Sequence, residues 1–506
     1  MRKAGRLRFA VWRIVAARTL AVLVVTVPVP RVVWSATPRP KMVVHVRLRR
    51  TVTATTWGVG VEWDPYSYYR PTAENQHVII KRLDFMRPSF LRVMGGISIH
   101  RGIVTTNPQL LLILRWAQGN NCKVILGQWG ASPLVNGKNG LAEKLVYTWS
   151  KRIASKVVYL RRQRGFTSIH FYNFVNEPET VPIARWAVLA RSLDKAFIKA
   201  GLGNEVYVIG PDTYGDPDWG ADPGKRSSYN WPLLRPVARR AAGFIGAYDI
   251  HWYPENSEVI DGRIAPVLER ERRTVCSITH FAAGMPFVVT EAGLLTGRCN
   301  GDQQPRVKTF GYGVLMADYA AQVFRAGWNG ISAWDLDDAM HVVNGKPITH
   351  PPGKLTLKIW GFWNSQAAAM GDPADFDIRP WFYTWSLMSR LFPAGTRIVD
   401  STEPAGTRRF RTLAGTRTVD HRLIINVALV NDVKKSRNIT VRVPPAAHAT
   451  TLTEYRYFRH DRPVDAQGLP IPAKILHNIS SVHSVNIFMP GRGVVFLTNR
   501  QPFETR

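Results

Sequence analysis

The 506-residue sequence is poor in cysteine and in acidic residues. Its 3 cysteines, Cys122, Cys276 and Cys299, show no CxxC or Cys/His spacing, so we expect free structural thiols and no metal site. Asp and Glu number 36 against 67 Lys and Arg, which gives a net charge of +31. The basic residues are scattered, without a zinc-finger, RNP-type or helix-turn-helix pattern, so we expect no nucleic-acid partner. Such a charge instead suits an acidic cell surface or an acidic glycan.

Long apolar runs are scarce, and the clearest one lies near the N-terminus. Residues 20–30 are too few for a typical membrane span, and they follow a basic, acid-free stretch, as in a secretory signal. Trp34 stands where a small residue is preferred before a cleavage site near Ala36. We expect residues 1–40 to be a signal peptide or, alternatively, a retained N-terminal anchor. The protein would then be secreted or associated with the cell envelope.

The rest of the chain has no fixed repeat, and its hydrophobic residues, 45% of the total with 17 Trp, suffice for a large core. Near-continuous apolar runs are typical of strands buried on both faces. Such runs occur at residues 55–63, 89–96, 122–129, 167–177, 205–212, 244–254, 286–293 and 330–338. Patterns of helical period lie between them, for example at 109–119, 141–163 and 313–327.

This alternation predicts an α/β fold, a (β/α)8 barrel over residues 41–395. A doubly wound open sheet is the alternative, but no glycine-rich phosphate loop follows the first strand. From residue 396 the pattern changes to short alternating strands separated by Gly, Pro, Asn and Asp. We therefore expect an all-β sandwich domain over 396–506, to which residues 41–50 could add a strand.

Two carboxylates end strands that are three units apart in the predicted barrel. Catalytic groups of such barrels lie at the carboxyl ends of the strands, so Glu177 and Glu291 are expected to face each other across the mouth. Glycoside hydrolysis needs such a pair: one carboxylic acid protonates the leaving oxygen, and the other attacks the anomeric carbon or activates water. The other polar or aromatic residues at strand ends are Glu62, Asp64, Arg92, Gln128, Trp129, Asn176, Asp212, His251, Tyr253, Trp334 and Asp335.

Three of these strand ends carry a family resemblance. "NEP" at Asn176 to Pro178, "TEAG" around Glu291 and "LRVMGG" around Arg92 together resemble clan A of the glycoside hydrolases, which includes families 5, 39 and 51. The resemblance spans roughly residues 50 to 392. It implies a (β/α)8 barrel, a retaining mechanism and no cofactor, and a C-terminal β-sandwich is familiar in families 39 and 51.

The resemblance also implies roles for single residues. Glu177 corresponds to the acid/base and Glu291 to the nucleophile, while Asn176 would bind the sugar 2-hydroxyl and Arg92 would support the nucleophile. The residues that would line the sugar site are His251, Tyr253 and Trp334. The ends of the first and third strands match no single family, so the sugar stays open.

Several strand-end residues have competing interpretations. Trp129 is expected to stack on a sugar ring, whereas Trp252 alternates away from its neighbours and is interpreted as core. Glu62 and Asp64 are interpreted as surface-loop residues, with binding of sugar hydroxyls as the alternative. Glu179 is interpreted as a charge at a helix N-terminus.

The sequence thus predicts a retaining glycoside hydrolase that acts on a β-linked glycan or its oligosaccharides. Two alternatives remain open. A non-catalytic glycan-binding or envelope protein could keep the same fold, although it would not need both Glu177 and Glu291. A transglycosylase would use the same covalent intermediate as a hydrolase.

Overall fold

The computed structural model describes most of the chain after residue 41. The described residues are 42–65, 71–100, 103–129, 142–215, 231–299, 302–338, 358–404, 407, 409–444, 451–477, 479 and 483–500. The predicted signal or anchor at residues 1–40 lies outside them. No helix in these ranges is long and apolar enough to cross a membrane.

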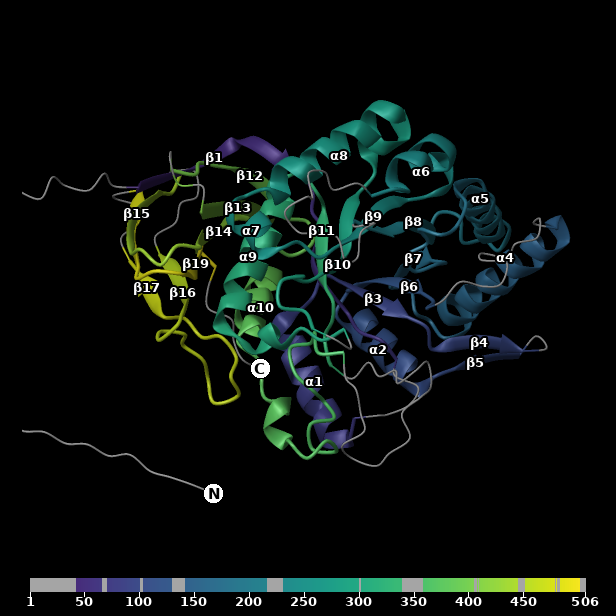
Figure 1. Ribbon diagram of the computed structural model, residues 1–506, viewed down its shortest axis with the longest axis horizontal. Coiled ribbons are helices and arrows are strands. Elements are labelled where there is room, and N and C mark those ends of the chain that lie inside the picture. Colours follow the sequence, from purple (N-terminus) through teal and green to yellow (C-terminus); the bar gives the residue numbers. More distant parts are fainter. Residues whose placement is uncertain are drawn as a thin grey trace, which may run out of the picture. The chain divides into compact units, whose positions relative to one another are not determined.

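A closed barrel of parallel strands forms the centre of the larger domain (Figure 1). Its strands follow one another around the barrel in the order β10, β11, β2, β3, β6, β7, β8, β9. They are β2 (Gly58–Glu62), β3 (Phe90–Met94), β6 (Lys123–Gly127), β7 (Ile169–Asn173), β8 (Tyr207–Tyr214), β9 (Ala247–Trp252), β10 (Phe287–Ala292) and β11 (Gly330–Ala333). Seven of them lie within the segments predicted from the sequence, and β8 extends two residues beyond its segment, so the (β/α)8 barrel is confirmed.

Helices follow the strands and cover the outside of the barrel. They are α1 (Ala73–Met86), α2 (Pro108–Gly119), α4 (Glu143–Val158), α5 (Ile183–Lys199), α6 (Leu234–Arg240), α7 (Asn256–Ile260), α8 (Ile264–Ile278), α9 (Phe310–Arg325) and α10 (Trp381–Leu391). Because helices cover one face and the barrel interior the other, β3 and β10 are buried along their whole length. Local signals fix some helix starts: Asn107 caps α2, and Pro108 occupies its first turn.

A two-stranded hairpin interrupts the pattern directly after β3. Its strands, β4 (Ile97–His100) and β5 (Ile103–Thr106), pair antiparallel, with Ile99 opposite Val104. Gly95 and Gly96 precede it with φ of 89° and 76°, a backbone region that favours glycine. A Cβ on Gly96 would lie 2.5 Å from the side chain of Pro65, so this turn has no room for another residue. The sequence patterns gave no prediction of this hairpin.

The C-terminal domain is a curled β-sheet, which confirms the predicted all-β module. Nine strands are joined in the order β17, β16, β19, β14, β13, β12, β1, β15, β18. They are β1 (Met42–Thr53), β12 (Arg397–Ser401), β13 (Phe410–Val419), β14 (Arg422–Asn431), β15 (Arg437–Arg442), β16 (Leu452–Phe458), β17 (Lys474–Leu476), β18 (Ser484–Met489) and β19 (Gly493–Thr498). The N-terminal strand β1 pairs antiparallel with β12 and parallel with β15.

The sheet domain packs against the barrel through α9. The guanidinium of Arg325 donates to the carbonyl oxygens of Ser401 at 3.0 Å and of Thr412 at 2.9 Å. The hydroxyl of Tyr457 donates to the carbonyl of Phe310 at 3.0 Å. The contact thus runs along α9, from Phe310 at its start to Arg325 at its end.

All three cysteines are free thiols in the structure. Cys122 is buried, which raises the pKa of its thiol, whereas Cys299 is exposed. A buried thiol with a raised pKa is a poor nucleophile, so Cys122 is a core residue.

Candidate active site

The two predicted catalytic carboxylates lie close together at the mouth of the barrel. Glu291 lies on β10, and Glu177 follows β7 with a φ of 46° in the left-handed region. An oxygen of one carboxylate lies within 4.8 Å of an oxygen of the other. The Glu291 side chain is 6% exposed and that of Glu177 33%. Glu291 is therefore shielded, whereas Glu177 can exchange protons with water.

Arg92 on β3 ties the ends of several barrel strands together. Its side chain is fully buried. One terminal nitrogen donates to Glu291 Oε1 at 2.5 Å and also to Glu62, and the other donates to Asn176 Oδ1 at 2.6 Å and Asp212 Oδ2 at 3.0 Å. Burial alone would lower the pKa of Arg92, but the surrounding carboxylates outweigh it and raise the pKa. The rigid guanidinium fork thus holds Glu291 and Asn176 in one fixed geometry.

His251 on β9 lies between the two catalytic carboxylates. Its Nδ1 is 3.0 Å from Glu177 Oε1 and 3.4 Å from Glu291 Oε2, and its Nε2 is 3.0 Å from Asp212 Oδ1. Burial disfavours the charged ring, but Asp212 and Glu291 outweigh burial and raise the pKa of His251 well above its usual value. These carboxylates therefore favour the protonated ring, in which both nitrogens are donors.

Tyr253, directly after β9, completes the surroundings of the predicted nucleophile. Its hydroxyl donates to Glu291 Oε2 at 2.8 Å. Burial and the Glu291 charge raise the pKa of Tyr253, so it remains a donor. Burial also raises the pKa of Glu291, but the positive charges of His251 and Arg92 oppose this effect. Both oxygens of Glu291 accept hydrogen bonds, which together with these charges oppose the effect of burial, although the pKa stays raised.

Glu177, His251 and Glu291 could each offer a ligand atom to a cation. However, both ring nitrogens of His251 already lie 3.0 Å from carboxylate oxygens, and the protonated ring that these carboxylates favour has no lone pair for a metal. The arrangement therefore fits an ion-paired acid/base site better than a metal centre.

The two predicted sugar-binding tryptophans differ in environment. Trp129 is 37% exposed, and its Nε1 donates to Asp64 Oδ2 at 3.2 Å. Trp334 is 5% exposed and packs near Tyr253, at 6.3 Å between ring centroids, and Trp360, at 5.4 Å. Among the residues that the structure describes, the buried Trp334 indole N–H has no partner. The Trp129 ring is partly exposed, with the Arg92 guanidinium 5.8 Å from its centroid.

Two interpretations from the sequence are wrong, because Glu62 and Asp64 do not lie in a surface loop. They are 0% and 5% exposed. Glu62 accepts from Arg92, and Asp64 accepts from the backbone amide of Met94 at 2.7 Å and from Trp129. Their position at the carboxyl end of a barrel strand indicates residues of the site. Their charge, which is typical of exposed residues, favoured the surface-loop interpretation instead.

Glu179 is not a charge at a helix N-terminus, since α5 begins only at Ile183. Its Oε1 accepts from the hydroxyl of Thr213 at 2.8 Å and from the amide of Tyr214 at 2.7 Å. Burial raises the pKa of Glu179 to about 7. This carboxyl therefore connects the segment after β7 to the end of β8.

The interpretation of Trp252 as a core residue is confirmed. Its side chain is 2% exposed, and its ring centroid lies 5.1 Å from that of Trp231.

Asp212 belongs to the site but was not among the residues predicted to bind substrate. It is 1% exposed, has a φ of 60° and accepts from both Arg92 and His251. Burial would raise its pKa, but these two cations outweigh burial and lower it. Its backbone amide donates to Asp249 Oδ1 at 2.7 Å. Asp212 thus orients two groups that contact Glu291.

The acidic pair at the end of β2 leads to a pH prediction. Burial raises the pKa of Glu62 well above its usual value and that of Asp64 to about 7. A carboxyl with a raised pKa in the folded state loses its contribution to stability as the pH rises through that pKa. The free energy of unfolding should therefore fall as the pH rises through about 7. Glu62→Gln, which keeps an acceptor for Arg92 and adds an amide donor, should reduce this fall by about 1–2 kcal/mol.

Urea denaturation at pH 6 and pH 8.5 measures the difference. Glu143→Gln, at an exposed position in the first turn of α4, is the control and should leave the fall unchanged. An equal fall for wild type and Glu62→Gln would contradict a proton held in this pair.

Several solved structures with a similar fold are glycoside hydrolases. A family 30 subfamily 8 xylanase from Clostridium acetobutylicum aligns over 90% of this chain and 98% of its own, with a TM-score of 0.55 and 12% identity. A glucosidase from Croceicoccus marinus aligns over the same shares, with a TM-score of 0.58 and 11% identity. A family 39 glycoside hydrolase from Bacteroides cellulosilyticus aligns over 88% and 81%, with a TM-score of 0.52 and 13% identity.

This chain shares the barrel fold of these glycoside hydrolases. The resemblance inferred from three short motifs is thereby confirmed for the fold. No protein-family model matches the sequence, and the comparison with curated proteins finds no match. Because the identities are low, the arrangement of side chains carries the functional argument.

Proposed function

We propose that the protein is a retaining glycoside hydrolase that cleaves a β-linked glycan or its oligosaccharides by double displacement. The observation that carries the proposal is the approach of Glu177 and Glu291 to within 4.8 Å between carboxylate oxygens. Retaining enzymes hold their two carboxyl groups about 5–5.5 Å apart, whereas inverting enzymes leave about 6.5–9.5 Å for a water molecule. The short separation thus supports direct attack by Glu291.

In the first step, Glu291 attacks the anomeric carbon while Glu177 gives its proton to the glycosidic oxygen. Arg92 and Tyr253 donate to different oxygens of Glu291. The carboxylate is therefore already oriented before it attacks and does not need to rotate. The product of this step is a glycosyl ester of Glu291 and a free leaving group.

In the second step, Glu177 removes a proton from a water molecule, which attacks the ester and restores Glu291. The imidazolium of His251 lies 3.0 Å from Glu177 Oε1, where it stabilises the carboxylate that remains after the first proton transfer. Asn176 precedes Glu177 and is held by Arg92, which supports a role for it in binding the sugar 2-hydroxyl.

A panel of nitrophenyl β-glycosides and soluble β-glycans tests the proposed function. At least one member should release nitrophenol or reducing sugar, with loss of turnover in Glu291→Gln. Chromatography of the products separates hydrolysis from transfer, because transfer yields longer oligosaccharides. Absence of turnover across the panel would count against hydrolysis and favour a glycan-binding protein on the same fold.

Replacing the acid/base should affect substrates according to their leaving groups. Glu177→Ala is expected to lower kcat/KM about 10²–10⁴-fold for glycosides whose leaving group needs a proton. Nitrophenyl glycosides should lose far less, because nitrophenolate leaves without protonation. Steady-state kinetics on both kinds of substrate measures the ratio, and equal losses would contradict the assignment of Glu177.

We also propose that this activity operates outside the cytoplasm. The support is the N-terminal sequence, in which an apolar run follows a basic stretch, as in a secretory signal. Polymeric glycans are the substrates that an exported enzyme of this kind would meet.

A further inference from the structure

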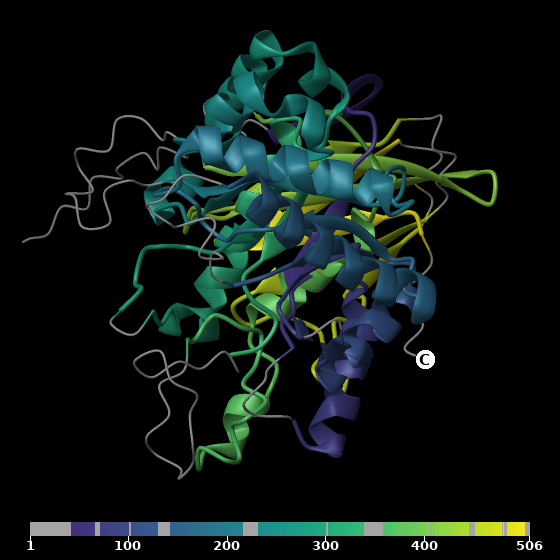
Figure 2. The ribbon, with the colours of Figure 1, turned by 90° about the vertical axis from the view of Figure 1, so that its right-hand side faces the viewer.

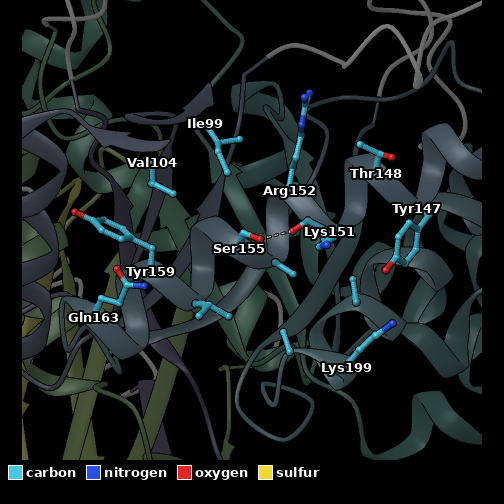
Figure 3. Close-up of a pocket in the computed structure, with 14 residues that line it drawn as sticks. Ile99, Val104, Tyr147, Thr148, Lys151, Arg152, Ser155, Tyr159, Gln163 and Lys199 are labelled. Carbon is cyan, nitrogen blue, oxygen red and sulfur yellow. Dashed lines mark hydrogen bonds between the residues drawn. The ribbon is translucent and has the colours of Figure 1, made fainter. Parts of the chain in front are cut away.

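A groove of about 830 Å³ lies on the outer helical layer, apart from the catalytic residues (Figure 3). The side of the barrel that carries α4 and α5 faces the viewer in Figure 2. The lining residues come from the hairpin β4–β5, from α4 with its continuation at Tyr159–Gln163, and from the end of α5. In the close-up, Ile99 and Val104 lie on one side, Lys199 on the other, and α4 runs between them. The groove is thus an elongated surface that three elements build.

The charges along the groove have one sign. Lys151, Arg152 and Lys199 line it, and all three are exposed. Among the described residues that line it, none is Asp or Glu. Beside it on α4, Lys156 has a lowered pKa because of burial and the nearby charge of Arg152. The groove therefore holds unneutralised positive charge that an anionic ligand would neutralise.

The remaining lining suits a carbohydrate. Tyr147 is 49% exposed, with the Lys199 ammonium over its ring at 5.7 Å from the centroid, and Tyr159 is half-buried. The Tyr159 ring and the uncovered part of the Tyr147 ring can contact the apolar face of a sugar. The hydroxyls of Thr148 and Ser155 donate to backbone carbonyls within α4 and keep their lone pairs for hydroxyl donors. Gln163 adds an exposed side-chain amide. Aromatic faces combined with neutral polar groups are expected for sugars more than for a peptide backbone.

We propose that this groove binds a segment of an anionic polysaccharide, one that carries carboxylate or sulfate groups, as a site separate from the catalytic one. The proposal rests on the proposed glycoside hydrolase function for the choice of a glycan over an acidic polypeptide. The hairpin leaves the barrel directly after β3, the strand that carries Arg92, so the two sites are joined by one short segment.

Isothermal titration calorimetry with a purified oligogalacturonate tests the groove without relying on turnover. The double variant Lys151→Ala/Arg152→Ala should raise Kd at least about tenfold, because charge-assisted contacts are lost. The matched control Lys434→Ala/Lys435→Ala removes the same charge from exposed positions of the sheet domain and should change Kd less than about twofold. Both double variants should keep the wild-type rate on a small nitrophenyl glycoside.

Each comparison decides a specific point. If the control variant loses as much affinity for oligogalacturonate as the groove variant, the effect comes from net charge alone and the proposal is overturned. Equally tight binding of poly-L-glutamate, lost in the groove variant, would identify an acidic polypeptide as the ligand and overturn the glycan assignment. Equally tight binding of a neutral cello-oligosaccharide would overturn the anionic requirement. If the double variant does not fold, Lys199→Ala at the other end of the groove gives the same test.

The outcome is independent of the catalytic proposal. A protein that binds oligogalacturonate at the groove but turns over no glycoside would refute the hydrolase and retain the binding site. An active hydrolase whose groove variants bind oligogalacturonate like wild type would refute the binding site and retain the hydrolase.

Discussion

Replacing Glu291 with alanine is expected to lower kcat on the best glycoside substrate by about 10⁵-fold, as for removal of a nucleophile in other enzymes with covalent intermediates. The reason is geometric: Glu291 receives hydrogen bonds from Arg92 at 2.5 Å and Tyr253 at 2.8 Å, so both donors are fixed around this one carboxylate. Another carboxylate could act as the nucleophile only if these donors moved.

Azide separates loss of a nucleophile from loss of structure. In the Glu291→Ala cavity, azide should attack a β-glycoside with an activated leaving group and give the α-glycosyl azide, with partial recovery of rate. Glu271→Ala is the control, because Glu271 is also a buried glutamate in an ion pair but lies on α8. It should lose stability and keep its turnover. Residual activity of Glu291→Ala close to wild type, without azide, would contradict the assignment.

Replacing Arg92 with alanine is expected to cost about 3–5 kcal/mol of unfolding free energy, because it leaves buried carboxylates without their cation. Glu62, Asp212 and Glu291 all pair with this guanidinium, and none of their side chains is more than 6% exposed. Without Arg92 the pKa of these groups should rise, so protonation can relieve part of the cost at low pH. The destabilisation should therefore be smaller at pH 5 than at pH 8.

Urea denaturation of wild type and Arg92→Ala at the two pH values measures this effect. Arg235→Ala is the control, because its side chain is 39% exposed while it pairs with Glu271. It should cost less and depend less on pH. A cost below about 1 kcal/mol for Arg92→Ala at both pH values would show that the cluster is not held by its arginine.

Much of this site could be predicted because a barrel converts sequence position into spatial position. Strands of a closed parallel barrel end at one mouth, so the residues at their ends converge whatever their separation in the chain. Glu177 and Glu291 could therefore be paired from apolar runs alone, and Arg92, Asn176, His251 and Tyr253 could be assigned to the same mouth. The structure brings all six together.

The parts that were not predicted depend on contacts that a local pattern does not encode. Glu62 and Asp64 are charged residues at the end of an apolar run, a pattern that usually marks the start of a loop. Ion pairing with Arg92 and hydrogen bonds from Met94 and Trp129 nevertheless keep them buried. Asp212 could be placed at a strand end, but its link between Arg92 and His251 needs the closed barrel. The groove needs the hairpin at residues 97–106 to lie against α4, a contact between separate elements.

The most direct test of the central claim is covalent labelling by 2-deoxy-2-fluoro β-glycosides with activated leaving groups, followed by peptide mapping. These compounds form the glycosyl ester rapidly and release it slowly, so they mark the nucleophile. The account predicts one glycosyl adduct per chain, located on Glu291, with loss of activity in proportion to labelling. An adduct on Glu177 or on Glu62, or hydrolysis with inversion and without any adduct, would contradict it.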